Sequence, residues 1–269
     1  LEHNHPEMIE NLSTCKSPHE MEGAILKSYY AKKMGIDPND IFVVSIMPCT
    51  VKKFESARPE LNYNNLQDVD AVLTTRELVR LFNMMGIDFD DLPEDEFDNP
   101  LGESSGAAVI FGTSGGVMEA ALRTAYFNIT GKELEKLEFH DIRGLEGIKK
   151  SVVHIGEMEL NIAVVNGIGN VEQMISEIKE GKTKYHFIEV MACPGGCING
   201  GGQPIHQKPE KVKKRIQALY EIDLKMSNRK SHNNISIQNI YKEFLIEPNS
   251  HIAHKILHTS YTDRRKIIK

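Results

Sequence analysis

The stretch Met191–Pro204, MACPGGCINGGGQP, constrains the fold more than any other part of this 269-residue chain. It contains two of the four cysteines and follows directly on the apolar run Tyr185–Met191, which is typical of a buried strand. A second apolar run, Ile41–Met47, is followed in the same way by Cys49. Since α/β proteins build their sites at the carboxyl ends of strands, the two runs predict thiols that meet at one place.

The remaining pattern predicts strands that alternate with helices, and then a charged helical tail after Pro204. Further strands are expected at Val69–Thr75 and as a pair around Gly156. Helices are expected at Ser17–Lys33 (with Ser17 as N-cap, Pro18 at the first position and Glu20 three residues on), after Thr75, at about 115–127 and at Asn170–Lys179. We expect the acidic segment Asp88–Pro100 to be a solvated loop. Together these elements predict an α/β fold with mostly parallel pairing.

Composition excludes several classes of protein. The net charge of −6 argues against nucleic acid as the main partner, because phosphate binding needs a concentrated basic surface. No apolar run is long enough to span a bilayer, and the N-terminus lacks the layout of a signal peptide. Four cysteines are too few for a secreted disulfide scaffold. We therefore expect a cytoplasmic, reducing setting, and the missing initiator Met indicates a fragment or a processed chain.

Several chemistries are open to Cys193 and Cys197, which Pro-Gly-Gly separates. A disulfide suits a reducing setting poorly, and zinc usually takes Cys-x2-Cys pairs, which are absent. One cysteine alone is best explained as a small buried hydrophobe, but three at two strand ends favour an iron–sulfur cluster. Glycines would let the backbone approach a bulky anionic cluster and direct amide N–H groups at it. These glycines are Gly195, Gly196, Gly200, Gly201 and Gly202.

The segment after Cys49 adds polar groups to this site. If the strand gives way to a helix, Lys52 lies one turn beyond Cys49 and can supply charge-assisted hydrogen bonds to anionic ligands. Lys53 is better explained as a solvated surface residue, and Glu55 could orient Lys52 or relay protons.

Three weaker patterns give little evidence for a functional site. The segment GTSGGV, at 112–117, lacks the Gly-Lys-Ser/Thr of a phosphate loop, and NGIGNVEQ lacks the third glycine of a dinucleotide-binding turn. His251, His254 and His258 fall near one helical face, but packing and a preference for the helix C-terminus explain them better than zinc.

At these residues the sequence resembles the FeFe (iron-only) hydrogenases. MPCTVKKFE (Met47–Glu55) and FIEVMACPGGCINGGGQP (Phe187–Pro204) resemble two long and specific signatures of that family. The resemblance extends from LSTCKSP (Leu12–Pro18) through IFGTSGGVMEAALR to HKILHTSY, and so covers nearly the whole chain. It implies two lobes of mostly parallel sheet flanked by helices around a buried iron–sulfur site. It further implies an H-cluster domain at 1–206 and a helical, small-subunit-like segment at 207–269.

The resemblance also implies a cofactor and a role for each matched residue. The family's H-cluster joins a 4Fe–4S cubane to a two-iron centre that carries CO, cyanide and a dithiolate amine. Cys49 and Cys193 would ligate the cubane, Cys197 would bridge the two parts, and Lys52 would hydrogen-bond a cyanide. Met47, Met191, Pro18 and Phe111 would pack against the two-iron centre, Ser13 would relay protons, and Glu55 and Gln203 would lie near the cluster.

This sequence departs from the family pattern in two ways. The first family signature, which supplies a fourth cubane ligand and a proton-donating cysteine, is absent, so we expect an N-terminally truncated chain that is inactive alone. Cys15 is expected to be a core residue rather than a substitute ligand. His19 stands where simpler members carry Gln, and in this it resembles catalytic subunits of multimeric, NAD-linked, electron-bifurcating members. The implied partners are ferredoxin, NADH-dehydrogenase-like subunits, upstream iron–sulfur domains and maturation proteins.

The favoured function is therefore reversible reduction of protons to hydrogen. Two alternatives stay open from the sequence. One is a hydrogenase-like iron–sulfur protein of cluster assembly, although such relatives generally lose the lysine and methionines that stand here. The other is a hydrogen sensor, whose distinguishing relay cysteine would lie in the absent first signature.

Overall fold

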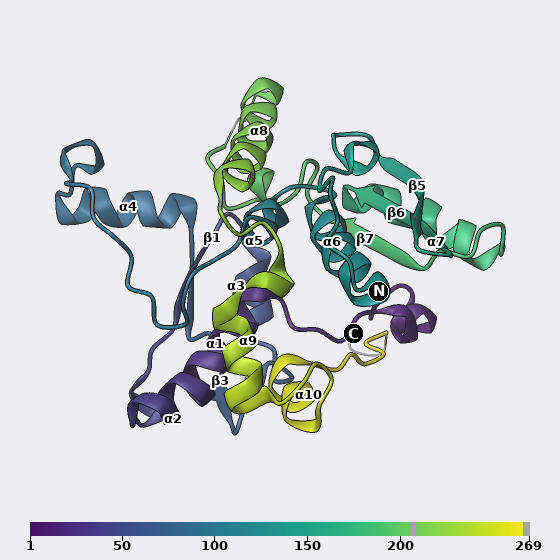
Figure 1. The fold of residues 1–269 in the computed structure, drawn as a ribbon. Coiled ribbons are helices and arrows are strands. Elements are labelled where there is room, and N and C mark those ends of the chain that lie inside the picture. The colour runs from purple at the N-terminus through teal and green to yellow at the C-terminus, as the bar shows by residue number, and fades with distance from the viewer. Residues whose placement is uncertain (206–207, 266–269) are drawn as a thin grey trace.

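A computed structural model describes residues 1–205 and 208–265 of the chain. It confirms the α/β class, with two groups of strands and helices on either side of a central region (Figure 1). The boundary expected between 206 and 207 lies outside the described residues. Within those residues no helix is long and apolar enough to cross a membrane.

One lobe is a sheet between helices. β5 (Ile148–Ile155) and β6 (Met158–Asn166) are antiparallel and form the strand pair expected around Gly156, whose φ is 60°. β7 (Phe187–Met191) pairs with β6 in parallel. The sheet lies beside α6 (Gly116–Thr130) and α7 (Val171–Lys179) (Figure 1).

Alternation along β6 explains why helices cover both faces of this sheet. Val164 packs in a cluster with Met118 of α6, whereas Val165 packs with Met174 of α7. Successive side chains of a strand point to opposite faces, so an unbroken apolar run predicts burial on both. The continuous run of buried residues at the end of β6 follows from this.

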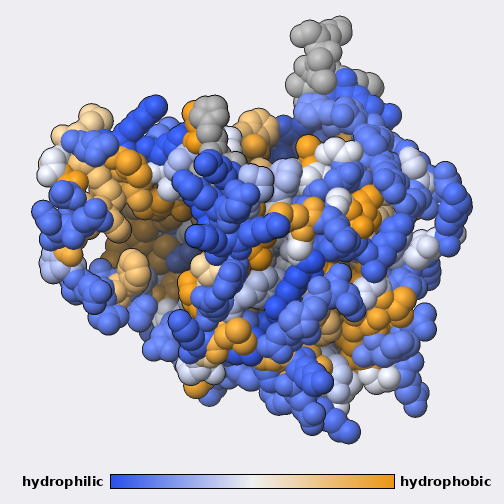
Figure 2. Space-filling view, turned by 90° about the horizontal axis from the view of Figure 1, so that it is seen from above, coloured by the Kyte–Doolittle hydropathy of each residue, from blue (hydrophilic) through white to orange (hydrophobic). Residues whose placement is uncertain are grey.

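The other lobe contains a parallel pair of strands. β1 (Val44–Met47) pairs with β4 (Ala71–Thr74), and Met47 lies opposite Thr74. β4 leads into α4 (Thr75–Met85), which projects from the molecule and buries none of its residues (Figure 1). A pocket of about 620 Å³ lies along α4, and Figure 2 shows this side of the molecule hollowed, with apolar residues in the hollow. The acidic segment 88–100 is exposed throughout, as expected.

The C-terminal helices complete these lobes rather than standing apart. Tyr220 of α8 (Pro209–Lys225) packs against Ala107 of α5 (Gly106–Val109). α10 (His251–Leu257) packs against α1 (Pro18–Ile25) in one apolar cluster. The remaining helices and strands are α2 (Ala31–Met34), α3 (Val51–Ser56), α9 (Ile235–Ile240), β2 (Asn62–Tyr63) and β3 (Leu66–Gln67).

The expected helix Ser17–Lys33 is present, with a π-helical turn, Leu26–Tyr30, between α1 and α2. Ser17 stands at the N-cap and Pro18 in the first turn, as expected, but the Ser17 side chain accepts no capping N–H. Its hydroxyl instead donates to Glu55 on α3 at 3.1 Å.

The first residues of the chain lie beside the last described residues (Figure 1). The backbone N–H of Arg264 donates to the carbonyl of Glu2 at 2.9 Å. The Glu2 carboxylate also accepts two bonds from Arg58, at 2.8 and 3.0 Å, and one from the N–H of Thr262. A single ion-pair cluster therefore ties both ends to the segment that follows α3.

Candidate metal centre

The first cysteine lies where β1 ends and α3 begins. Pro48 and Cys49 follow the last residue of β1, and α3 starts two residues later at Val51. Cys49 is partly buried. The short helix places Lys52 and Glu55 on one side, three residues apart, and their side chains form an ion pair. The strand-to-helix transition expected after Cys49 is therefore present.

The other two cysteines lie in the loop after β7. Gly195 and Gly196 have φ of 87° and 97°, which residues with a side chain rarely adopt, and they turn the chain between Cys193 and Cys197. Asn166, at the end of β6, holds this turn by accepting the N–H of Gly195 at 2.6 Å. Cys193 is partly buried and Cys197 is exposed, so thiols on this loop can reach an external group.

Glycines join the two cysteine segments to each other. The N–H of Gly202 donates to the carbonyl of Pro48 at 3.0 Å. A Cβ on Gly202 would lie 2.6 Å from the backbone nitrogen of Cys49, and one on Gly200 would lie 2.0 Å from the Pro48 oxygen. Gly200 and Gly202 therefore let the backbones of the two cysteine segments approach each other. A role for any of the five glycines in facing a cluster stays a prediction.

All four cysteines are free thiols, so a disulfide between Cys193 and Cys197 is not formed. Burial raises the pKa of the Cys197 thiol, and the adjacent Cys49 and Cys193 thiols raise it further, while Lys52 opposes them. The side chains of Cys49, Cys193 and Lys52 are therefore close enough to Cys197 to act on its thiol. Thiolates are the ligands of iron–sulfur clusters, and a nearby cation offsets their charge, so this set of residues fits such a cluster.

A chain of hydrogen bonds leads from Lys52 into the protein. Lys52 donates to Glu55 Oε2, which also accepts from His19 Nε2 at 3.0 Å and from Ser17 Oγ at 3.1 Å. His19 is buried, and its Nδ1 lies 3.0 Å from Ser45 Oγ on β1. Burial acts to raise the pKa of Glu55, but the bonds from His19 and Lys52 outweigh it and lower that pKa to about 2.

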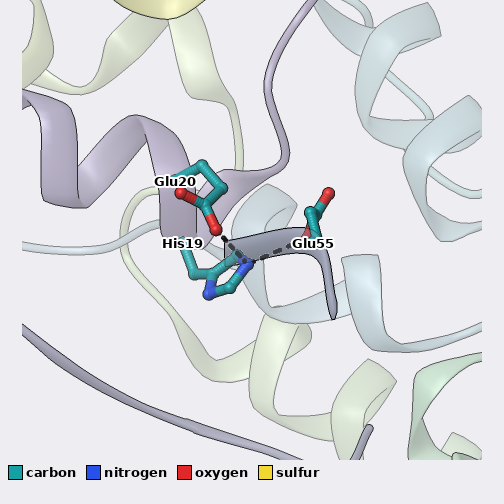
Figure 3. Close-up of side chains that lie close together, drawn as sticks. All are labelled: His19, Glu20 and Glu55. Atoms are coloured by element: carbon teal, nitrogen blue, oxygen red, sulfur yellow. Dashed lines mark hydrogen bonds and ion pairs between the residues drawn. The ribbon is translucent and has the colours of Figure 1, made fainter. Parts of the chain in front are cut away.

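Glu20 and Ser45 belong to this site, and the sequence reading missed both. Glu20 is fully buried beside His19 and Glu55 (Figure 3). Its Oε1 lies 3.2 Å from His19 Nε2, and among the described residues neither of its carboxylate oxygens accepts a hydrogen bond. The charged residue in the first turn of a predicted helix suggested a capping role, whereas α1 directs this side chain inward.

The other expected site residues lie at differing depths. Met47 and Met191 end β1 and β7 and are partly buried, and Phe111 packs against the cluster of α5 and α8. Ser13 and Pro18 are exposed, and Ser13 Oγ accepts the N–H of Cys15 at 3.3 Å. Whether any of these five residues contacts a cofactor stays a prediction.

The expectation that Cys15 is a core residue is wrong. Cys15 is exposed and pairs through its backbone with His258. His258 in turn stacks on His254, with ring centroids 4.3 Å apart. Cys15 and His258 form an isolated bridge outside every sheet of the described residues, so no further strand among them covers the Cys15 side chain.

The comparisons with known proteins agree on one family. The family model described as "Iron only hydrogenase large subunit, C-terminal domain" matches residues 1–201, and "Iron hydrogenase small subunit" matches residues 209–264. The NADP-reducing hydrogenase subunit HndD of Solidesulfovibrio fructosivorans is 51% identical over 99% of this chain. Iron hydrogenase 1 of Clostridium pasteurianum is 44% identical over 97% of it. The chain spans 46% of the length of each of these relatives.

More distant and structural relatives were also found. The cytosolic Fe-S cluster assembly factor narfl of Xenopus tropicalis is 30% identical over 97% of this chain, which spans 56% of narfl. Among solved structures, a HydA FeFe-hydrogenase from a study of stepwise H-cluster assembly gives a TM-score of 0.83. It is 42% identical, and the match covers 98% of this chain and 73% of that one. The apo form of HydA1 from Chlamydomonas reinhardtii gives 0.84 with the same identity and coverage.

Proposed function

Because this chain belongs to the iron-only hydrogenase family, we propose that it holds an H-cluster and catalyses reversible reduction of protons to hydrogen within a longer protein. The observation that supports this most is that the contact between Gly202 and Pro48 brings together cysteines from two strand ends, with Lys52 close enough to lower the pKa of the Cys197 thiol. When bound, the H-cluster supplies the redox chemistry, and the protein supplies ligands, charge and orientation.

Each residue has a proposed role. Cys49 and Cys193 would hold the cubane, and Cys197 would link it to the two-iron centre. Lys52 would donate to a cyanide, and Met47, Met191, Pro18 and Phe111 would exclude water around that centre. Ser13 would pass protons toward it, and Gln203 and the five glycines would shape the loop around the cluster. The proposed division is an H-cluster domain at 1–206 and a small-subunit-like segment at 207–269.

Partner proteins follow from the relatives. HndD is a subunit of an NADP-reducing hydrogenase, and its 51% identity supports partner subunits that handle a pyridine nucleotide. We further propose ferredoxin as an electron carrier, upstream iron–sulfur domains, maturation proteins and a cytoplasmic location. Cluster assembly is the second candidate, supported by the 30% identity to narfl. The greater identity to hydrogenases favours catalysis.

Substitution of single cysteines tests the ligand set. In the parent protein matured with its cofactor, Cys197→Ser should abolish hydrogen evolution from a reduced donor and lower the bound iron per chain. Lys52→Ala should also abolish activity, because the ammonium that offsets the cluster charge is lost. Cys15→Ser is the matched control and should retain both iron and activity, since Cys15 lies beside His258 instead.

Infrared spectroscopy separates the two candidate functions. A hydrogenase loaded with its two-iron centre should show CO and cyanide bands, whereas an assembly factor that carries only cubanes should show none. Absence of those bands from the matured parent would reject the hydrogenase proposal. An unaltered iron content in Cys197→Ser, with activity retained, would reject the assigned ligand.

A further inference from the structure

The buried carboxylate of Glu20 and the buried imidazole of His19 lie behind Lys52. The hydrogen bonds described above give His19 partners but leave Glu20 without one among the described residues. Glu20 has no exposed surface, and within residues 1–205 and 208–265 its carboxylate accepts no hydrogen bond, although His19 Nε2 lies 3.2 Å from Oε1. The same nitrogen lies 3.0 Å from Glu55 Oε2, so a single N–H faces two carboxylates from two helices (Figure 3). An isolated buried carboxylate is costly, and such groups are normally paired or neutralised.

The neighbouring charges show how the buried Glu20 carboxylate can be neutralised. Glu55 and Lys52 cancel as an ion pair, which leaves Glu20 and His19 to balance each other. They can do so as carboxylate and imidazolium, or as carboxylic acid and neutral imidazole. Both arrangements contain the same number of protons. Each has one proton more than a Glu20 carboxylate beside a neutral His19 imidazole. In the first, Nδ1 donates to Ser45 Oγ, and in the second the Ser45 hydroxyl donates to Nδ1, at 3.0 Å in either case.

A divalent cation is the other way to neutralise this cluster, and the geometry disfavours it. Ligand atoms of His19, Glu20 and Glu55 lie within 4.8 Å of one another. However, Glu55 Oε2 already accepts from Lys52, Ser17 and His19, so the oxygen nearest the imidazole has no free lone pair. The ammonium of Lys52 would also repel a cation at that oxygen.

We propose that Glu20 and His19 are positioning residues for Lys52: together they hold one proton, which leaves this buried pair without net charge, while His19 donates to Glu55 and Glu55 holds the Lys52 ammonium beside the cysteines. This inference deepens the proposed function and rests on it for the role of Lys52. Ser45 is the third member of the arrangement, because its hydroxyl serves either protonation form of His19.

The charged groups around Glu20 support a retained proton. Burial raises the pKa of Glu20 to about 7, and the carboxylates of Glu55 on α3 and Asp68 before β4 add to the increase. Lys52 and Lys16 oppose it. Lys16 acts weakly because its ammonium is already bound to Asp68 at 2.6 Å, where both side chains are buried.

The proton can be counted in the iron-free chain. At pH 6 the wild type should show either the infrared carbonyl band of a buried carboxylic acid or the ring-nitrogen NMR shifts of an imidazolium at His19. The carbonyl band should weaken as the pH rises through the Glu20 pKa of about 7. Glu20→Gln should remove the infrared band or shift the imidazole signal, whereas Glu22→Gln, exposed on the same helix, should change neither. Carboxylate with neutral imidazole at pH 6 would overturn the proposal.

The positioning role has its own readout, the rate at which an amine reagent labels Lys52, with Lys53 as internal reference. His19→Leu should raise the relative rate at least about threefold, because an unsupported Glu55 holds the ammonium less firmly. His19→Gln should restore much of the protection, since its amide can donate to Glu55. An unchanged rate in a folded His19→Leu protein would overturn the proposal.

Dialysis against Zn²⁺ and Mn²⁺ tests the cation alternative. The wild type and Glu20→Gln should bind the same amount of metal per chain. If the wild type bound one more metal ion per chain than Glu20→Gln, the cluster would be a metal site and the shared proton would be rejected. None of these measurements needs the H-cluster. They can therefore fail while hydrogenase activity is found, or succeed while it is not.

Discussion

At the scale of single residues, glycines decide whether the two cysteine segments can meet. Gly202 is buried against the backbone of Pro48 and Cys49, while Gly201, its neighbour, is exposed. Neither has a positive φ, so the difference between them is one of space and not of backbone conformation. The two positions therefore form a matched pair for testing how closely the segments must approach.

Gly202→Ala should reduce reconstitution of an iron–sulfur cluster far more than Gly201→Ala. The added methyl group in Gly202→Ala would lie 2.6 Å from the Cys49 nitrogen, whereas in Gly201→Ala it would approach only Thr50 Oγ1, at 3.3 Å. Iron per chain and the visible absorption of the cluster measure the outcome. Equal reconstitution in both variants would show that contact between the segments does not govern cluster binding.

At this scale the sequence predicted correctly those features that neighbouring residues determine. The strand ends that carry Cys49 and Cys193 follow from apolar runs, and the helix that carries Lys52 begins where expected. Sequence prediction failed for the side chains of Ser17 and Glu20, whose capping pattern is a local rule. The competing partner of Ser17, Glu55, is distant in sequence, and no local pattern encodes that pairing.

At the scale of elements, α4 is the least supported helix, because it buries none of its residues and depends on its ends. Thr74 forms a capping box: its hydroxyl accepts the N–H of Glu77 at 3.2 Å, and the Glu77 carboxylate accepts the N–H of Thr74 at 2.8 Å. Gly86, with φ of 70°, ends the helix. Threonine at the N-cap and glycine just past the last turn are residue types that favour helix ends.

Thr74→Ala should destabilise α4 by about 1 kcal/mol, because the N–H of Glu77 loses the Thr74 hydroxyl that accepts it. The result should appear as faster amide exchange in the first turns of α4. Thr75→Ala is the control, since Thr75 follows the cap and makes no capping bond, and it should slow exchange or leave it unaltered. Equal acceleration in both variants would contradict a role for the box.

At the scale of the whole molecule, an ion pair and a hydrogen bond hold the first residues of the chain against residues 262–264. The Glu2 carboxylate contacts Arg58, Thr262 and Arg264, and the bond from Arg58 is the main cause that lowers the pKa of Glu2 to about 2. Family-level features could be predicted from sequence at this scale, including the helical tail. The closure of the tail onto the first residues could not, because it depends on ion pairs between the two ends.

Acid should release the C-terminal segment. The pKa of Glu2 is below its ordinary value of 4.5 in the folded protein, so its stabilising contribution is complete above pH 4.5 and is lost as the pH falls toward 2. Amide protection at Thr262 and Arg264 should therefore fall between pH 6 and pH 3. Glu2→Gln should lower that protection at pH 6 and flatten its pH dependence, whereas Glu10→Gln, exposed on the same segment, should behave as wild type.

The contact between the two cysteine segments has a consequence for biosynthesis. The loop with Cys193 and Cys197 is packed on Pro48 and is held from beyond by α8, since Arg215 donates to the carbonyl of Ile198 at 3.0 Å. A ribosome must therefore complete α8 before this bond can form. In a nascent chain that is stalled before α8, the loop with Cys193 and Cys197 should be held less firmly against Pro48, and its thiols should react faster with an alkylating reagent than those of the complete chain.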